Sequence, residues 1–470
     1  MSASKWWRHP VTRSVAMLGS TLLLAGVGQW VMPAAAPAPT TVVMPISSLA
    51  LVCPGLPADT PGLGITVKGA MLQGTQGATL TLQGAKPRTA SVKAAGVTSV
   101  PVTTSATALF SASGPAASQL VADASITGIS PTTKGYAAFT CQPPSNSQWL
   151  VGGSSKVGRT SMLSIANVDE TAATVAIDVW SEAGKSSARS LQGISIPARS
   201  VKQLPLGMIE PDRSMFVIHV IASSGQVTSV VIDRGQQALT SLGIDAITPV
   251  SSPLASALVG VIPDGANNAT LALLSPGIPT AARVSLVTSD GTYPLAGAEN
   301  LTLDADKPML IRLPDAALEG DVLVLVQADG AVVSGVSEQI SIKGGADLAS
   351  ASMMSPIYRV ASLTVDATVS EATALLYSEV NADATAIVRT GTTEATQTVH
   401  LRAGHVTRVK LIGSAGQTRL VSIRPAVDGV VSGSVLLKRG SLGMTASSVE
   451  PLTSVRGYVT VPPVAPDLSR

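Results

Sequence analysis

Aromatic and charged side chains are both scarce in this sequence. Aromatic residues make up 3% and charged residues 13% of the 470 positions. Platforms that stack bases or sugars need exposed rings, and few are available here. The formal net charge of +2 gives no reason to expect a nucleic-acid partner. Hydrophobic residues reach 45%, which predicts packed cores and excludes a chain kept disordered by its charge.

Cysteine is nearly absent, since Cys53 and Cys141 are the only two. Two cysteines cannot make a structural zinc site, and we predict no metal and no cofactor. Both cysteines follow the N-terminal hydrophobic segment and therefore lie in the part we expect to be exported. In an oxidising compartment a single pair of this kind predicts a disulfide, with two unpaired thiols as the alternative.

Long hydrophobic runs are confined to the N-terminus. Residues 1–13 form a basic segment that we expect in the cytoplasm, and the uncharged residues 14–32 would span about 28 Å as a helix, close to the hydrocarbon thickness of a bilayer. Residues 33–50 read as a Pro/Ala-rich linker. The pattern predicts a transmembrane anchor or a signal helix, with the rest of the chain outside the cytoplasm.

Tryptophans mark both ends of this hydrophobic segment. Trp6 and Trp7 precede it and Trp30 closes it, as expected for residues at the two membrane interfaces of a retained anchor. A signal peptide would need a small-residue cleavage site, which residues 34–36 offer, although Pro37 follows them. We favour a single-pass anchor with an extracellular C-terminal bulk, and keep secretion after cleavage as the alternative.

Past the linker, short alternating runs separated by Gly, Pro, Asn and Asp predict strands and turns. In Thr174–Val179, for example, Val175, Ile177 and Val179 would share one face. The same order of segments recurs with a period near 100 residues, the size of an immunoglobulin-like sandwich. We therefore predict an all-β fold of tandem immunoglobulin-like β-sandwich modules after one transmembrane helix. The predicted ranges are a degenerate module with the cysteine pair at 51–148, further modules at 149–250, 254–345 and 353–445, and an extended tail at 446–470.

Three features also carry a family resemblance. They are Leu163-Ser-Ile-Ala-Asn167, the entry Trp149-Leu-Val-Gly-Gly153, and the Val-Ser-Gly strands that end at Gly335 and Gly433. On these features the chain resembles an uncharacterised family of actinobacterial membrane-anchored or secreted proteins, known as a domain of unknown function. The resemblance implies an envelope location and assigns no catalytic residue.

Histidines offer little for catalysis or metal binding. His9 precedes the membrane segment, and His219 alternates with apolar residues along a strand, which predicts a partly buried ring. His400 and His405 flank one turn without a third ligand nearby in sequence. The run Gly184-Lys185-Ser186 ends like a phosphate-binding loop, but the first glycine is missing and a hairpin is expected after it.

Carboxylates and the remaining rings complete the candidates. The acidic pairs and groups follow no calcium-loop spacing, so we expect them in solvated loops; they are Asp304, Asp306, Asp315, Glu319 and Asp321. An exposed row of Trp149, Trp180 and Tyr293 would indicate carbohydrate binding. We predict no catalytic residue and a non-enzymatic envelope scaffold that binds another envelope protein or a wall polymer. The alternatives are an envelope hydrolase whose site joins a histidine to a carboxylate and a serine, and an array of carbohydrate-binding modules.

Overall fold

The computed structural model describes residues 40–56, 62–73, 76–84, 86–94, 96–102, 105–343, 345–413, 416–448 and 455–461. The chain divides into two compact units, one formed by residues 46–454 and the other by the two ends of the chain. The predicted membrane segment 14–32, with Trp6, Trp7 and Trp30, lies outside the described residues. Among the residues that are described, no helix is long and apolar enough to cross a membrane.

The unit made of the chain ends contains one antiparallel pair of strands. In it, β1 (Thr40–Pro45) pairs with β35 (Val455–Val461). The segment predicted as an extended tail therefore includes a strand, and its partner comes from the segment predicted as a linker. The sequence did not indicate this pairing. The two segments lie about 400 positions apart, so no short hairpin turn connects them and marks them as partners.

The large unit is all-β and antiparallel, which confirms the predicted fold class at that level. Its strands follow the predicted alternation. In β12 (Ala173–Ser181), Val175, Ile177 and Val179 are buried, whereas Thr174 and Asp178 are only partly covered. Short strands of this kind leave one face apolar, and two such faces pack against each other to make a core.

Four modules repeat one topology of two sheets. We call the sheet that contains the last strand of a module its inner sheet, and the other its outer sheet. In module 1 (residues 48–140) both sheets contribute to a single apolar cluster. Its outer sheet has the order β2 (Ser48–Cys53), β7 (Thr107–Ser113), β4 (Ala78–Gln83), β5 (Arg88–Val92). Its inner sheet has the order β6 (Val97–Val102), β3 (Leu63–Met71), β8 (Leu120–Gly128), β9 (Gly135–Thr140). The module predicted to be degenerate thus has the full set of strands.

Module 2 (residues 147–247) and module 4 (residues 361–448) repeat this order strand for strand. The outer sheet of module 2 has β10 (Ser147–Val151), β16 (Val217–Ser224), β12, and a divided edge made of β13 (Gly184–Lys185) and β14 (Ile194–Ile196); its inner sheet has β15 (Ser200–Pro205), β11 (Arg159–Asn167), β17 (Thr228–Gln237), β18 (Thr240–Ile247). Module 4 has β27 (Ala361–Val365), β32 (Arg419–Pro425), β29 (Ala382–Thr390), β30 (Thr393–Leu401) outside and β31 (Thr407–Lys410), β28 (Glu371–Ser378), β33 (Val431–Arg439), β34 (Gly443–Ser448) inside.

Module 3 (residues 254–354) differs in one respect. Its strand β25 (Val322–Ile342) runs without a break through both sheets and so joins them. The outer part holds β19 (Leu254–Ile262), β21 (Thr280–Thr288), β22 (Gly291–Pro294) and β23 (Leu301–Leu303); the inner part holds β24 (Met309–Arg312), β20 (Ala266–Leu274) and β26 (Gly345–Met354). Because β26 pairs antiparallel with β25, module 3 continues past residue 345, where the sequence pattern suggested its end.

Among the residues that the structure describes, helical segments are short and lie in the connections. They are η2 (Gly114–Gln119), η3 (Arg189–Leu191), α2 (Leu206–Ile209) and η4 (Asp315–Ala317). None of these four exceeds six residues, so they serve as turns between strands.

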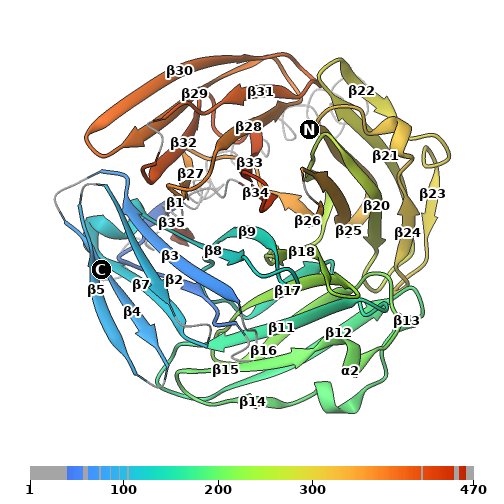
Figure 1. Cartoon of the computed structure of the whole chain (residues 1–470), viewed down its shortest axis with the longest axis horizontal. Helices are drawn as coiled ribbons and strands as arrows, with labels where there is room; N and C mark the ends of the chain where they lie inside the picture. The colour runs from blue at the N-terminus through green and yellow to red at the C-terminus, as the bar shows by residue number, and fades with distance from the viewer. Residues whose placement is uncertain are drawn as a thin grey trace, which may run out of the picture. The chain divides into compact units, whose positions relative to one another are not determined.

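Within the large unit, each module contacts the next and module 4 contacts module 1. Apolar clusters cross the boundaries: Val230 and Ile232 of β17 join the core of module 1, and Trp180 of module 2 packs with Leu274 of module 3. Leu420 of module 4 packs with residues of β3 and β8. The last strand of each module lies nearest the middle of this unit (Figure 1), where β9, β18, β26 and β34 pack against one another. We call these four the axial strands.

Candidate functional site

The predicted disulfide is present and confirms that expectation. Cys53, at the end of β2, is bonded to Cys141, which follows β9, with 4.6 Å between the Cα atoms. Both residues are buried, and the backbone of Val52 exchanges two hydrogen bonds with Gln142 beside them. The bridge therefore ties the first strand of module 1 to its axial strand.

His219 lies in an aromatic stack at the boundary between modules 2 and 3. Its ring is stacked on Trp149, with 3.8 Å between centroids, and Trp149 is stacked on Trp180 at 5.6 Å. Trp149 and Trp180 are 6% and 2% exposed because they pack against module 3, so they do not form a surface row with Tyr293, which is 51% exposed. Trp149 and Trp180 therefore pack between modules 2 and 3 and are not available to stack on a carbohydrate.

His219 is also the histidine that meets a serine and a carboxylate. Its Nε2 lies 2.9 Å from the Ser147 hydroxyl, and Asp178 is its cross-strand neighbour. Burial lowers the pKa of His219 to about 4, while Asp178 acts to raise it and Lys185 to lower it. Efficient general bases have a pKa near the working pH, so this neutral ring is a weak base. The Asp178 carboxylate forms an ion pair with Lys185, whose Nζ lies 3.0 Å away, instead of orienting the imidazole of His219.

The other predicted candidates lie apart from one another. His400 pairs with Asp383 at 2.6 Å, whereas the Nδ1 of His405 contacts the carbonyl of Ala403 in its own turn at 2.7 Å. Gly184 and Lys185 lie in a hairpin with Gly184 at φ 99°. Nowhere in the described ranges do three or more His, Cys, Asp or Glu side chains gather in a way that could hold a metal ion.

The acidic candidates act as turn and boundary groups. Asp306 accepts a hydrogen bond from the Gly277 amide at 3.3 Å, and Asp315 accepts one from Asn268 at 3.3 Å. Asp321 departs from the expectation of a solvated loop, because its side chain is 6% exposed and pairs with Arg408 of module 4 at 2.5 Å. That ion pair lines a cleft of about 140 Å³ between modules 3 and 4.

The contact between module 4 and module 1 is built on buried charge. Lys68 of β3 is fully buried, and its Nζ lies 3.0 Å from Asp366, which follows β27. The hydroxyl of Tyr136 donates to the same carboxylate at 2.7 Å. Asp123 of β8 accepts hydrogen bonds from the amide and the hydroxyl of Thr364, at 2.7 and 2.8 Å. We call these five residues the closing contact.

Electrostatics in the closing contact favour one charge arrangement. Burial acts to raise the pKa of Asp366, but the Lys68 ammonium and the Tyr136 hydroxyl outweigh it and leave that pKa below its usual value. For Asp123 burial prevails and raises the pKa, although Lys68 and Thr364 oppose the rise. Removing the ammonium would therefore leave two buried carboxyl groups without a counter-charge.

Only the closing contact has this chemistry at its position in the repeat. Lys68 and Asp123 face each other across β3 and β8, and the equivalent cross-strand pairs of the other modules have no such ion pair. Those pairs are Ser164 with Val230, Ala272 with Gly335, and Leu375 with Ser434. Modules 1 to 4 follow one another along the chain, so the boundary between modules 4 and 1 is the one without a covalent connection across it. Its buried polar groups can select the correct neighbour where the chain does not.

A second polar centre lies where the axial strands meet. Asp347 of β26 accepts hydrogen bonds from the amides of Ile244 at 3.1 Å, Leu348 at 3.0 Å and Met444 at 2.9 Å, which belong to three different axial strands. The other three modules have glycine at the corresponding position, namely Gly135, Gly243 and Gly443. A Cβ on Gly443 would lie 2.0 Å from Asp347 Oδ2 and one on Gly243 would lie 2.2 Å from Asp347 Oδ1, so these two glycines make room for this single carboxyl group.

Two further buried carboxyl groups, Asp245 and Glu338, belong to this region, and Asp245 interacts electrostatically with both Asp347 and Glu338. Burial, with a smaller contribution from Asp233, raises the pKa of Asp245 to about 7, although hydrogen bonds to its carboxylate oppose the rise. Burial also raises the pKa of Glu338 and of Asp347 well above the usual range, and Asp245 adds to both shifts. Among described residues, both carboxyl oxygens of Glu338 and Oδ2 of Asp245 have no hydrogen-bond partner. Nearby, a cavity of about 20 Å³ lies among small side chains of the axial strands, room for about one water molecule.

Sequence reasoning missed both polar centres. Lys68 and Asp123 lie in strands that alternate as any half-exposed strand does, Asp366 directly follows such a strand, and each reads as a solvent-facing charge. One signal was present: Asp347 replaces a glycine that recurs at the corresponding position of the other axial strands, where it begins β9 and β34 and lies within β18. An aligned comparison of the four repeats would have marked it.

These observations define an all-β protein of four repeated two-sheet modules, in which the polar side chains of the interior join modules to one another. A family model matches residues 97–412, and the chain belongs to that family, described as a family of unknown function (DUF5719). The match confirms the resemblance to a domain of unknown function. No curated protein matches the chain.

Solved structures add little. The lipid-containing bacteriophage PM2 gives 10% identity and a TM-score of 0.12 over 66% of this chain and 97% of that chain. A DUF4785 family protein from Legionella pneumophila gives 10% and 0.11 over 67% and 89%. Infectious bursal disease virus gives 10% and 0.09 over 86% and 83%. Similarities this low carry no inference about fold or function.

Proposed function

We propose that this protein is a non-enzymatic scaffold of the cell envelope, whose modules are immunoglobulin-like sandwiches that present their outer surfaces to another envelope protein or a wall polymer. One observation carries the proposal: the side chains best suited to chemistry join modules together. Lys68, Asp123 and Tyr136 build the closing contact, and His219 belongs to the aromatic stack. A reactive group that also holds the fold is poorly placed to bind and release a substrate.

An extracytoplasmic location is part of the proposal. The buried Cys53–Cys141 disulfide supports it, since such bonds persist in oxidising compartments and are rare in the cytosol. The basic flank and the apolar residues 14–32 favour a retained membrane anchor, and secretion after cleavage remains the alternative. The family resemblance suggests an actinobacterial envelope as the setting.

Location is tested with a C-terminal reporter that is active only outside the cytoplasm. The full-length chain with the reporter after residue 470 should give reporter activity. The same protein, taken from acid-trapped cells, should have no thiol that reacts with a maleimide before reduction. A silent reporter, together with two reactive thiols, would place the chain in the cytoplasm and end the envelope proposal.

A hydrolase is the second candidate, because Ser147 lies 2.9 Å from His219. A fluorophosphonate probe reacts with activated serines and discriminates the two functions. The scaffold predicts equal background labelling of the wild-type chain, the Ser147→Ala variant and a control Ser145→Ala variant from the same segment. Labelling that disappears only in Ser147→Ala would establish a nucleophile and favour the hydrolase.

A further inference from the structure

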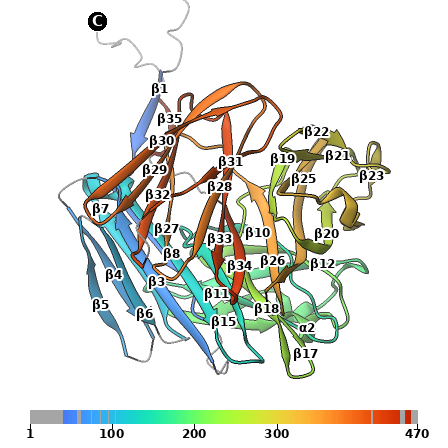
Figure 2. The same ribbon diagram turned by 45° about the horizontal axis from the view of Figure 1, so that its top comes forward.

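The strand β30 forms a long free edge of module 4. It is the last strand of its sheet, and within the described part of the chain it pairs with β29 alone. It has nine residues, and those from Thr393 to Thr398 are all exposed. The corresponding edges of the other outer sheets are shorter or divided: β5 has five residues, β13 and β14 have two and three, and β22 and β23 have four and three. Figure 2 shows β30 at the outside of its sheet.

Long unprotected edges are uncommon because their free N–H and C=O groups pair with other strands. The register fixes which groups of β30 are free. Thr390 faces Thr393 across the two-residue turn Gly391–Thr392, with Gly391 at φ 58°. The pair that closes such a turn is hydrogen-bonded, and inward and outward groups alternate along the strand. The backbone groups that point away from β29 therefore belong to Glu394, Thr396, Thr398 and His400.

We propose that a second copy of this chain pairs with β30 along this edge, antiparallel and around a two-fold axis at Gln397. This register sets Glu394 opposite His400 of the second copy and Thr396 opposite Thr398 of the second copy. Each facing pair exchanges two backbone hydrogen bonds, about eight in all. The two outer sheets become one continuous sheet, and an isologous contact of this kind closes on itself as a dimer.

Charge complementarity selects both the occupant and the register. Within one chain, Arg389 pairs with Glu394 at 2.8 Å and Asp383 pairs with His400 at 2.6 Å, each across β29 and β30. In the proposed dimer the row Arg389, Glu394, His400 and Asp383 alternates in sign across four strands, when His400 is protonated, and occurs twice by symmetry. Opposite charges and Thr–Thr pairs are favourable cross-strand neighbours. Shifting the register by two residues puts Glu394 opposite Thr398 and breaks the row.

Cysteine cross-linking of the purified full-length chain tests the dimer, because both native cysteines are already in a disulfide. At the axis, the two Gln397 residues form a non-hydrogen-bonded pair with Cα atoms about 4.5 Å apart, a spacing that a disulfide spans. Gln397→Cys should give a disulfide-linked species of twice the chain mass under mild oxidation. Thr393→Cys is the matched control, exposed on the same strand, and its two copies would be about 26 Å apart.

A blocking variant separates pairing from chance collision. Thr398→Pro removes an N–H that points outward and leaves the hydrogen bonds to β29 in place. Combined with Gln397→Cys it should lower the dimer yield about tenfold while the melting temperature stays that of Gln397→Cys alone. The proposal is overturned if Gln397→Cys links no faster than Thr393→Cys, or if Thr398→Pro leaves the yield unchanged.

Discussion

Asp245 is predicted to make the fold less stable at neutral than at acidic pH. Its carboxyl group is buried among the axial strands, and burial raises its pKa from 3.8 to about 7. Well below pH 3.8 the group is protonated in both the folded and the unfolded state, so its ionisation does not change the free energy of unfolding. Between the unfolded pKa of 3.8 and the folded pKa of about 7, the unfolded chain releases the proton first as pH rises. The folded state therefore loses stability until the pH reaches about 7. A difference of about 3 pKa units corresponds to about 4 kcal/mol.

Asp245→Asn removes this pH-dependent loss, because the amide has no proton to release in that range. The variant keeps an oxygen that can accept from Thr445, which lies 3.3 Å from Asp245 Oδ1. We expect the free energy of unfolding at pH 8 to exceed that of the wild type by up to about 4 kcal/mol, and the two proteins to agree near pH 4. Part of the gain comes from Glu338 and Asp347, whose pKa values Asp245 raises.

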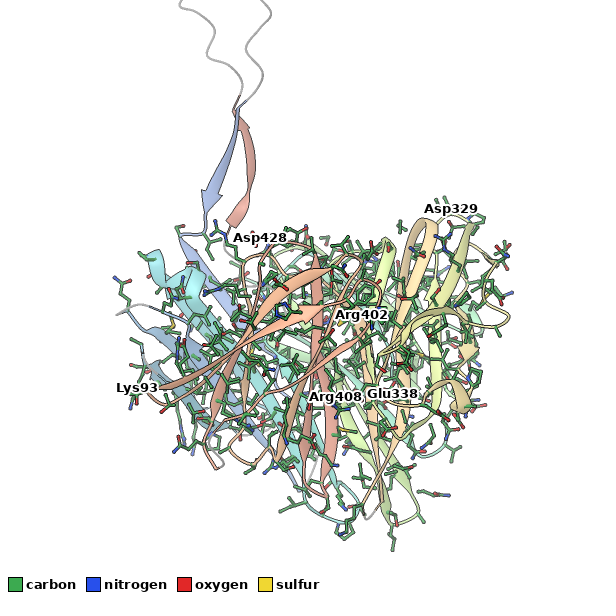
Figure 3. All side chains as sticks on the ribbon, turned by 90° about the horizontal axis from the view of Figure 1, so that it is seen from above. Lys93, Asp329, Glu338, Arg402, Arg408 and Asp428 are labelled. Atoms are coloured by element: carbon green, nitrogen blue, oxygen red, sulfur yellow. A yellow bond between two sulfur atoms is a disulfide. The ribbon has the colours of Figure 1, made fainter. Side chains whose placement is uncertain are left out.

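The assay is denaturant unfolding of the full-length chain, followed by circular dichroism from pH 4 to pH 8. Asp329→Asn is the control, because Asp329 is exposed and lies at the end of a strand pair of module 3 (Figure 3). Equal unfolding free energies of Asp245→Asn and the wild type at pH 8 would refute the reasoning. So would a gain of the same size at pH 4, which would show that the charge of Asp245 is not its cause.

Three further variants test the other contacts. Lys68→Met should lower the free energy of unfolding by about 3 kcal/mol, since it leaves Asp366 buried without its counter-charge, and adding Asp366→Asn should recover part of the loss if charge is the reason. Replacing both Cys53 and Cys141 by serine opens a loop of 88 positions and should cost about 4–5 kcal/mol in denaturant unfolding; no change would mean that the bond adds nothing to stability. Gly443→Ala should lower the melting temperature by several degrees, because its Cβ would lie 2.0 Å from Asp347, whereas Gly64→Ala, whose nearest neighbour would be 3.9 Å away, should change it little.

The repeat explains why much of the architecture could be predicted. Alternation along segments such as Thr174–Val179 reports directly on burial, because neighbouring side chains of a strand point to opposite faces. The pairing of Cys53 with Cys141 followed from there being no other cysteine to choose. The position of β26 did not follow, since a strand that continues the pattern of β25 gives no sign of where the module ends.

The sequence by itself determined the local structure. Strands, turns and the repeat follow from the periodic spacing of apolar and turn residues, and the disulfide follows because there are only two cysteines. Only the tertiary structure decided which module faces which, and that choice gave the polar residues their roles. Lys68 and Asp366 lie about 300 positions apart, and Asp347 meets amides from three axial strands. No pattern along a strand encodes such partners, because burial of a charge depends on the surface that packs over it.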